Sequence, residues 1–210
     1  MLIIGAKGLA KEVLEIFHQK NELENLYFYD NISKDIPDCL YERFPVLKNT
    51  KEVLQIFKKD NRFTLGLGNP LFRLDFYKKF KDMGGILVSV ISPSAQIGHF
   101  GTMIGDGCTI MAGNIITNDV HIGVGCLINP NCTISHDSLI GNFVEISPGV
   151  QVTGNCVIGD YCSIGTGAII LPKIKLGNSV VVGAGAVVRN DVPEGQTVIG
   201  IPAKVLTKKE

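Results

Sequence analysis

The sequence has no tryptophan, no excess of charge of either sign and no long apolar run. Its 20 basic and 20 acidic residues cancel, whereas a protein that binds nucleic acid or an anionic membrane surface through charge needs a basic excess. No apolar run approaches the roughly 20 residues of a membrane-spanning helix, and the first residues lack the charged start of a secretory signal peptide. We therefore expect a soluble, cytoplasmic protein that binds no nucleic acid and does not insert into a membrane.

Aromatic residues are scarce in the second part of the chain. Residues 1–88 contain 12 of the 15 aromatic residues and 26 of the 40 charged residues, but only 6 of the 24 glycines. A change of composition of this size indicates two domains. We place them at residues 1–88 and 89–210.

A six-residue repeat fills most of the second part. Each repeat has a branched aliphatic residue, a mostly small residue two places earlier and, in most cases, Gly, Asn or Asp three places later. The aliphatic positions are Ile104, Ile110, Ile116, Ile122, Ile128, Ile134, Ile140, Ile146, Val152, Ile158, Ile164, Ile170, Leu176, Val182 and Val188. Because Gly, Asn and Asp tolerate a positive φ, each repeat predicts a short strand followed by a corner.

A second period of 18 residues is superimposed on the first. Glycines follow the aliphatic residue at every third repeat, at Gly105, Gly123, Gly141, Gly159 and Gly177. Three repeats per coil predict a triangular parallel β-helix, with successive coils about 4.8 Å apart. Ile91 and Ile97 predict one further coil, joined through a one-residue slip near Gly101. The spacing leaves the handedness open, and the general rule for crossovers favours a right-handed one.

Five of the six cysteines share the small inward position of the repeat. They are Cys108, Cys126, Cys132, Cys156 and Cys162, which differ by multiples of six. This pattern indicates buried small side chains rather than metal ligands or a disulfide framework.

The first part has the pattern of a small Rossmann-like α/β domain. Apolar strand segments alternate with amphipathic helical segments, which predicts a parallel sheet that binds ligands at the carboxyl ends of its strands. The segment Gly5-Ala-Lys-Gly8 lies between the first strand and helix and is placed to cradle phosphate. Asp30, at the end of the second strand, is placed to accept ribose hydroxyls. A tight turn without a ligand, or a nicotinamide site, fits the same pattern.

One histidine of the four has the neighbours that catalysis requires. His136 is followed directly by Asp137, and Asn129 lies on the preceding side of the coil. A carboxylate that holds one imidazole nitrogen leaves the other free to act as a base. The residue one coil later is Gly154, whose N–H is placed to face an oxyanion. A base beside an exposed amide favours acyl transfer.

Three segments together resemble the bacterial sugar acyltransferases, a family that includes sialic-acid O-acetyltransferases and the bacillosamine-pathway N-acetyltransferase. They are His136-Asp137 within hexapeptide repeats, the ending Gly200-Ile-Pro-Ala-Lys204 and the start Gly5-Ala-Lys-Gly8-Leu-Ala-Lys-Glu-Val13. The resemblance covers essentially the whole chain. It implies a left-handed β-helix and a homotrimer, with acetyl-CoA in grooves between subunits and a free or nucleotide-linked sugar at the N-terminal domain.

The resemblance also assigns roles to individual positions. His136 resembles the general base, Asp137 the acidic residue that raises its basicity and Asn129 a polar active-site asparagine. The positions that imply contacts with acetyl-CoA are Glu145, Gly154, Thr166 and Ala184. Those that imply contacts with the nucleotide portion of the acceptor are Lys7, Gly8, Leu9, Asp30 and Asn31. Leu9 and Glu145 both depart from the family pattern, which commonly has histidine there.

The implied reaction is direct transfer of an acetyl group from acetyl-CoA to an amine or hydroxyl of a sugar, without a metal. A non-catalytic nucleotide-sugar scaffold is one alternative. A β-helix carbonic anhydrase is another, although His99, His121 and His136 occupy different repeat positions, which does not suit a three-histidine metal site. A sugar nucleotidyltransferase would need a longer first domain. The acceptor sugar, N- or O-transfer, the acyl group and the pathway stay open.

Overall fold

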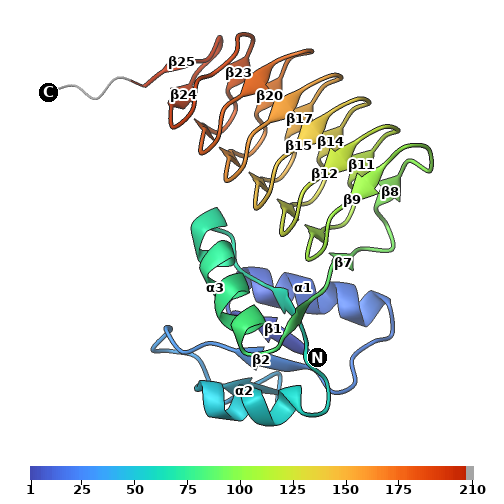
Figure 1. The fold of residues 1–210 in the computed structure, drawn as a ribbon, viewed down its shortest axis with the longest axis vertical. Coiled ribbons are helices and arrows are strands. Elements are labelled where there is room, and N and C mark those ends of the chain that lie inside the picture. Colours follow the sequence, from blue (N-terminus) through green and yellow to red (C-terminus); the bar gives the residue numbers. More distant parts are fainter. Residues whose placement is uncertain (207–210) are drawn as a thin grey trace, which may run out of the picture.

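An α/β unit is followed by a column of stacked coils in the computed structural model, which describes residues 1–206. Figure 1 shows the unit in blue to green, with the coils rising from it in green to red. None of the helices within residues 1–206 has the length and apolar character that crossing a membrane demands.

The α/β unit is built on a six-stranded sheet with the order β3-β4-β2-β1-β5-β6. Its strands are β1 (Leu2–Ile4), β2 (Tyr27–Tyr29), β3 (Cys39–Leu40), β4 (Phe44–Leu47), β5 (Arg62–Leu65) and β6 (Ile86–Leu87). All neighbours are parallel except β3 and β4. The strand segments predicted from the sequence correspond to β1, β2 and β5. The β3–β4 pair has no counterpart among the predicted elements; β4 contains Pro45, a residue type that disfavours strands.

Helices cover both faces of this sheet. Helix α1 (Gly8–Gln19) packs on one face through residues that include Val13 and Phe17. Helices α2 (Thr50–Phe57) and α3 (Pro70–Asp82) pack on the other, around Phe63 and Phe80. Helices α1 and α3 begin a few residues after β1 and β5, so both start near the carboxyl-terminal edge of the sheet.

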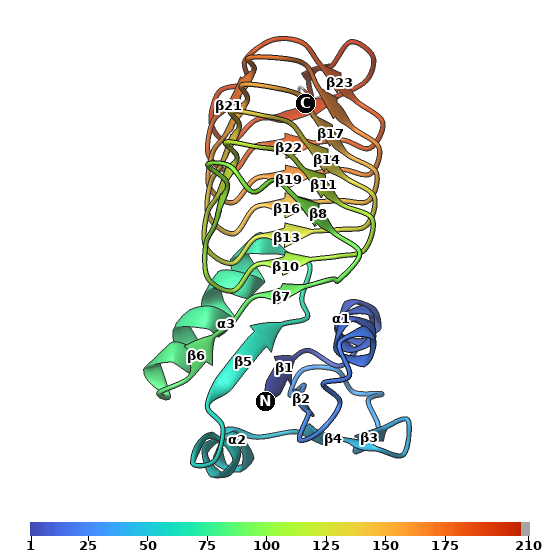
Figure 2. The same ribbon diagram turned by 90° about the vertical axis from the view of Figure 1, so that its right-hand side faces the viewer.

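The coils form three sheets, which we call faces 1, 2 and 3; their strands are parallel except for β25, which is antiparallel to β24. Figure 2 shows strands of face 1 stacked one above another. Face 1 contains β7 (Val90–Ile91), β10 (Thr109–Ile110), β13 (Leu127–Ile128), β16 (Glu145–Ile146), β19 (Ser163–Ile164), β22 (Val181–Val182), β24 (Thr197–Ile199) and β25 (Lys204–Val205). Face 2 contains β8 (Gln96–Ile97), β11 (Ile115–Ile116), β14 (Thr133–Ile134), β17 (Gln151–Val152), β20 (Ile169–Ile170) and β23 (Val187–Val188). Face 3 contains β9 (Met103–Ile104), β12 (His121–Ile122), β15 (Leu139–Ile140), β18 (Val157–Ile158) and β21 (Lys175–Leu176).

The register confirms the predicted 18-residue coil. Ile110 pairs with Ile128 and Ile128 with Ile146, and the same offset holds on the other faces. The predicted further coil is also present, since β7, β8 and β9 pair with β10, β11 and β12. We propose that the two domains meet at residues 88 and 89, between β6 and β7.

The corners adopt positive φ more regularly than the residue types predict. The predicted Gly, Asn and Asp corners have positive φ, for example Asp119, Asn131 and Gly149. Phe143 and Tyr161 occupy equivalent corners with φ of 52° and 61°, a conformation that costs about 1–2 kcal/mol for such residues. Their rings stack with centroids 6.3 Å apart, which offsets part of this cost.

The interior of the column contains the repeated aliphatic residues and the small residues two places before them. The five repeat cysteines are all free and buried, as predicted. Side chains directly before each aliphatic residue point outward, so neighbouring positions differ sharply: Ile116 is 1% exposed and Ile115 is 42% exposed.

This contrast gives a matched test of the fold. Ile116→Asp places an unpaired carboxylate in the interior, and we expect it to reduce the free energy of unfolding by about 4 kcal/mol or more. Ile115→Asp makes the same chemical change on the outside of face 2 and should leave the folded state intact. Thermal unfolding followed by circular dichroism measures both. Equal melting temperatures for the two variants would contradict the inward assignment of Ile116.

Candidate active site

Three loops meet at the carboxyl-terminal edge of the N-terminal sheet. They follow β1, β2 and β5, which lie side by side. The loops pack tightly, because a Cβ on Gly5, whose φ is 102°, would lie 2.8 Å from the carbonyl oxygen of Gly66. Parallel sheets bind ligands at this edge. The residues predicted to bind the nucleotide portion of the acceptor lie on these loops or at the start of α1: Lys7, Gly8, Leu9, Asp30 and Asn31. Asn129, the other predicted substrate contact, lies on the column after β13.

The start of α1 has no side-chain cap. Its N-cap residue, Lys7, makes no capping hydrogen bond, whereas Asn49 caps α2 and Asn69 caps α3. Lys7 and Gly8 are exposed and Leu9 is half-buried. The unpaired N–H groups and the positive end of the helix dipole, together with the ammonium of Lys7, suit an anion such as a phosphate.

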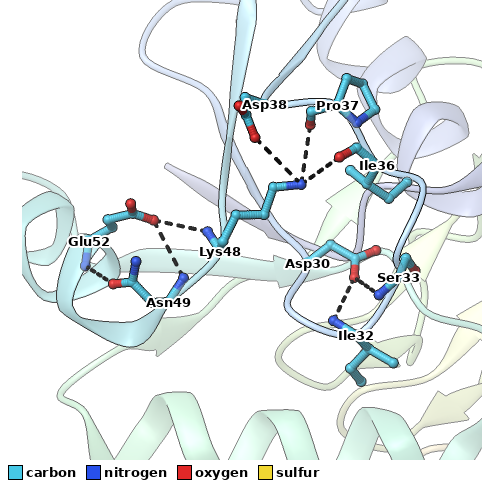
Figure 3. A network of polar contacts seen from close by, with 9 residues as sticks. All are labelled: Asp30, Ile32, Ser33, Ile36, Pro37, Asp38, Lys48, Asn49 and Glu52. Carbon is cyan, nitrogen blue, oxygen red and sulfur yellow. Dashed lines mark hydrogen bonds and ion pairs between the residues drawn. The ribbon is translucent and has the colours of Figure 1, made fainter.

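Asp30 closes a turn directly after β2. Its Oδ1 accepts hydrogen bonds from the N–H groups of Ile32 and Ser33, at 3.1 Å and 2.9 Å, as Figure 3 shows. Burial alone would raise the pKa of this carboxyl, but the two amide hydrogen bonds and the nearby ammonium of Lys7 outweigh burial and lower it. Asp30 is therefore ionised at neutral pH. Both amide hydrogen bonds end on Oδ1, which leaves Oδ2 without a main-chain donor within residues 1–206 and available to a ligand hydroxyl. The nearby hydroxyl of Ser33 also helps to lower the pKa of Asp30.

The candidate base lies on the edge between faces 2 and 3, in the turn from β14 to β15. The Nδ1 atom of His136 lies 2.7 Å from Oδ2 of Asp137, and Asp137 has a φ of 60°. Ser138 fixes the turn, because its Oγ donates to the carbonyl of Thr153 at 3.1 Å and accepts from the N–H of Cys156 at 3.2 Å. The side chains of His136 and Asp137 are 62% and 53% exposed. The imidazole is thus oriented by a carboxylate and open to a reactant.

Gly154 lies directly against the imidazole of His136, one coil further along the column. A Cβ at this position would lie 2.7 Å from both Cε1 and Nε2 of the ring, so only glycine leaves room for it. The N–H of Gly154 donates no hydrogen bond to any residue in the described part of the chain. The predicted stacking of these two residues is therefore present.

The other residues predicted to contact acetyl-CoA lie elsewhere on the column. Thr166 and Ala184 are exposed on the edge between faces 1 and 2, 18 residues apart. Asn129 lies on this same edge, buried, and its Nδ2 donates to the carbonyl of Ile146 at 3.0 Å. Face 2 separates this edge from His136 within one chain. One chain alone does not bring the two groups of residues together.

Arg73, which the sequence analysis did not single out, joins the α/β unit to the column. It is 1% exposed. Its guanidinium donates to the carbonyls of Gly125 at 3.1 Å, Phe143 at 2.8 Å and Val144 at 3.0 Å, and also to that of Gly68. Burial lowers the pKa of Arg73 to about 10, although Glu145 partly opposes this. Its position in the run Leu-Phe-Arg-Leu on α3 is the only sequence feature that could have indicated it.

Glu145 lies on face 1, half-buried beside this junction. Its Oε1 is 3.4 Å from the place that a Cβ on Gly68 would occupy, so it borders the loop after β5. Burial raises the pKa of Glu145, and the nearby Arg73 opposes the rise only in part. Glu145 therefore faces the acceptor end of the α/β unit rather than His136 of the same chain.

Within the part of the chain that the structure describes, no group of three or more His, Cys, Asp or Glu side chains is arranged to hold a metal ion. His121 is exposed on face 3, and His99 and His18 are exposed far from Asp137 in sequence. The geometry presents an imidazole that is oriented by a carboxylate and packed against Gly154, whose N–H is free within the described residues; a base and an oxyanion site need such groups.

Comparisons with known proteins match both parts of the chain. Residues 1–80 match the family described as PglD N-terminal domain. Residues 137–172 and 155–190 match the bacterial transferase hexapeptide of six repeats. A comparison with curated protein sequences found no significant match.

Solved structures match over nearly the full length. The acetyltransferase domain of PglB from Neisseria gonorrhoeae is 32% identical over 98% of each chain, with a TM-score of 0.88. PerB from Caulobacter crescentus, solved with CoA and GDP-perosamine, is 29% identical over 98% of this chain and 96% of its own, with a TM-score of 0.89. WeeI from Acinetobacter baumannii is 28% identical over 98% of each chain, with a TM-score of 0.89.

Fold and site thus define an acyltransferase of the hexapeptide-repeat class. The chain belongs to the family of sugar acetyltransferases that carry a PglD N-terminal domain before the repeats. The fold class predicted from the sequence and the resemblance, a Rossmann-like domain followed by a left-handed parallel β-helix, is confirmed.

The contact between Gly154 and His136 can be tested without an activity assay. Gly154→Ala should displace the imidazole, because the added methyl would occupy the space of Cε1 and Nε2. We expect the ring resonances of His136 to shift in NMR spectra while the melting temperature changes little. Gly8→Ala is the control, since a Cβ at Gly8 meets nothing within 4 Å. Unchanged His136 resonances in Gly154→Ala would contradict the stacking.

The raised pKa of Glu145 predicts how stability depends on pH. A carboxyl whose pKa is higher in the folded than in the unfolded chain binds more protons when folded, so its ionisation on raising the pH destabilises the fold. Glu145→Gln removes this cost. We expect the melting temperature of the variant, relative to the native chain, to rise from about pH 4 to about pH 8. Glu12→Gln, at an exposed site on α1, is the control; a falling or flat difference for Glu145→Gln would contradict the burial.

Proposed function

We propose that the protein transfers the acetyl group of acetyl-CoA directly to the amino group of a nucleotide-linked amino sugar. The observation that carries this proposal is the pair His136–Asp137, 2.7 Å apart and exposed, with the imidazole packed against Gly154, whose N–H has no partner within residues 1–206. Family membership supports the acetyl transfer, and the match to PerB in complex with CoA and GDP-perosamine supports a nucleotide-linked acceptor.

His136 acts as the general base. Asp137 accepts the hydrogen bond of Nδ1–H and so leaves the lone pair on Nε2. As the acceptor nitrogen forms its bond to the thioester carbonyl carbon, Nε2 takes the proton that this nitrogen loses. The C–S bond then breaks, and the CoA thiolate leaves and is protonated. A base in this position contributes about 10²–10⁴ to the rate.

Gly154 supplies the oxyanion site in this mechanism. Gly154 packs against the imidazole, and its N–H has no partner among residues 1–206, so this N–H is free to donate to the oxygen that gains negative charge when the amine attacks. The repeat cysteines play no part as nucleophiles, because they lie in the interior of the column. Transfer is therefore direct, without an acyl-enzyme.

The acceptor binds through its nucleotide portion at the carboxyl edge of the N-terminal sheet. The uncapped start of α1, with Lys7 and Gly8, takes the diphosphate. The free Oδ2 of Asp30 accepts a ribose hydroxyl, and Asn31 and Leu9 border the same site. This arrangement leaves the amino sugar to extend toward Glu145 and the column.

We further propose that the active site is shared between subunits of a homotrimer. His136 and Gly154 lie on one edge of the column, whereas Asn129, Thr166 and Ala184 lie on another, so a single chain cannot offer both to one acetyl-CoA molecule. The apolar side chains that point outward can pack against the column of a neighbouring chain. Among them, Met103 and Leu139 on face 3 are 58% and 45% exposed.

Substitution of His136 tests the catalytic role. His136→Ala should lower turnover by about 10²–10⁴ while acetyl-CoA still binds. Asp137→Asn should cost less, because it removes only the group that orients the base. Release of the CoA thiol, measured with acetyl-CoA and a panel of nucleotide-linked amino sugars and sialic acids, reports the rate and separates amine from hydroxyl acceptors.

His18→Ala is the matched control, since His18 is exposed in the last turn of α1, outside the predicted site and the column, and should keep the native rate. Turnover by His136→Ala close to that of the native chain would exclude His136 as the base. Binding of a nucleotide sugar with no thiol release for any acceptor would instead indicate a non-catalytic scaffold.

A further inference from the structure

A small cavity opens beside the predicted ribose contact. It has a volume of about 160 Å³ and is lined by two residues of the loop after β2, Asn31 and Ile32, and three residues of α3, Asp75, Phe76 and Lys79. Ile32 is 72% exposed, and Figure 3 shows it projecting from the loop that Asp30 closes. The cavity is smaller than the roughly 300 Å³ of a pocket for a whole ligand, so it suits one part of a larger molecule.

The position of the cavity indicates which part of a nucleotide-linked ligand it would hold. Asn31 follows Asp30, the residue proposed to accept a ribose hydroxyl. The base of a nucleotide is joined to its ribose, so it must lie next to this contact. Ile32 and Phe76 provide apolar walls, and bases held outside a helix are commonly bound between apolar or aromatic side chains.

Two charged side chains that line the cavity, Asp75 and Lys79, indicate which base it would hold. Asp75 and Lys79 are four residues apart on α3 and share one side of the helix. They form no ion pair within residues 1–206, because the ammonium of Lys79 instead donates to Oη of Tyr29 at 3.1 Å and lies 5.2 Å from the centre of that ring. The carboxylate of Asp75 is exposed and accepts no hydrogen bond in the described chain. It is therefore free to read the edge of a base.

We infer that this cavity binds guanine and that Asp75 selects it, an inference that rests on the proposed nucleotide-linked acceptor. A carboxylate has only acceptors, and guanine is the base with two adjacent donors, N1–H and the 2-amino group, on its pairing edge. Lys79 lies one turn further along the helix, where it can donate to O6. Uracil offers one N–H between two carbonyls, and adenine presents an unprotonated N1 to the carboxylate.

Calorimetric titration of the full chain with GDP, UDP and ADP tests this inference. GDP should bind at least about tenfold more tightly than UDP or ADP, the discrimination expected of one bidentate contact. Asp75→Asn should weaken GDP binding by about the same factor. It should also prefer xanthosine diphosphate over GDP, because xanthine has a carbonyl in place of the 2-amino group and pairs with a carboxamide donor. A purely structural role for Asp75 would not produce this exchange of preference.

Asp82→Asn is the control, since Asp82 ends the same helix outside the cavity and should leave GDP binding unchanged. UDP or ADP binding as tightly as GDP, no nucleotide binding at all, or an unaltered preference in Asp75→Asn would each overturn the inference. The thiol-release assay distinguishes a failure of the guanine inference from a failure of the proposed acetyl transfer. Transfer to UDP-linked acceptors alone would support the proposed acetyl transfer and refute the guanine site. Selective GDP binding without transfer to any acceptor would support the guanine site and refute the acetyl transfer.

Discussion

The backbone hydrogen bonds between successive coils set the geometry on which the site depends. Each coil bonds to the next at a constant offset, as in the bond from the N–H of Asn155 to the carbonyl of His136 at 2.9 Å. The offset fixes which residue lies beneath His136, and that residue is Gly154. It also aligns Thr166 with Ala184 along a different edge. Because the strands contain two residues each, inward and outward positions cannot exchange without loss of the whole core.

The contacts of Arg73 position the acceptor-binding edge of the α/β unit relative to the column. A buried guanidinium needs several acceptors, and here carbonyls from the loop after β5 and from two corners of the column provide them. The same contact brings Gly68 beside Glu145. The acceptor edge of the α/β unit is thereby held against face 1. Removal of Arg73 would leave four main-chain carbonyls to find new partners.

The sequence predicted the column in more detail than the site. A strict period determines register, core and corners, so the stacking of His136 on Gly154 followed from counting 18 residues. The corners at Phe143 and Tyr161 were not predicted, since stacking imposes a positive φ that their residue types do not favour. Arg73 was missed because its partners are carbonyls distant in sequence, which no local pattern reveals. The assignment of Asn129, Glu145, Thr166 and Ala184 to one site with His136 stays a prediction, because it depends on contacts between chains.

The proposal that two chains build each active site is tested most directly by complementation. Chains with His136→Ala lack the base on one edge, and chains with Thr166→Trp carry an obstruction on the other; each should be inactive alone. When the two are co-expressed with different tags and the mixed trimers are purified, one of the three sites in each mixed trimer should combine two intact edges and recover activity, because each cyclic interface joins one edge of each kind. Mixed oligomers that remain as inactive as the parent variants would contradict a shared site.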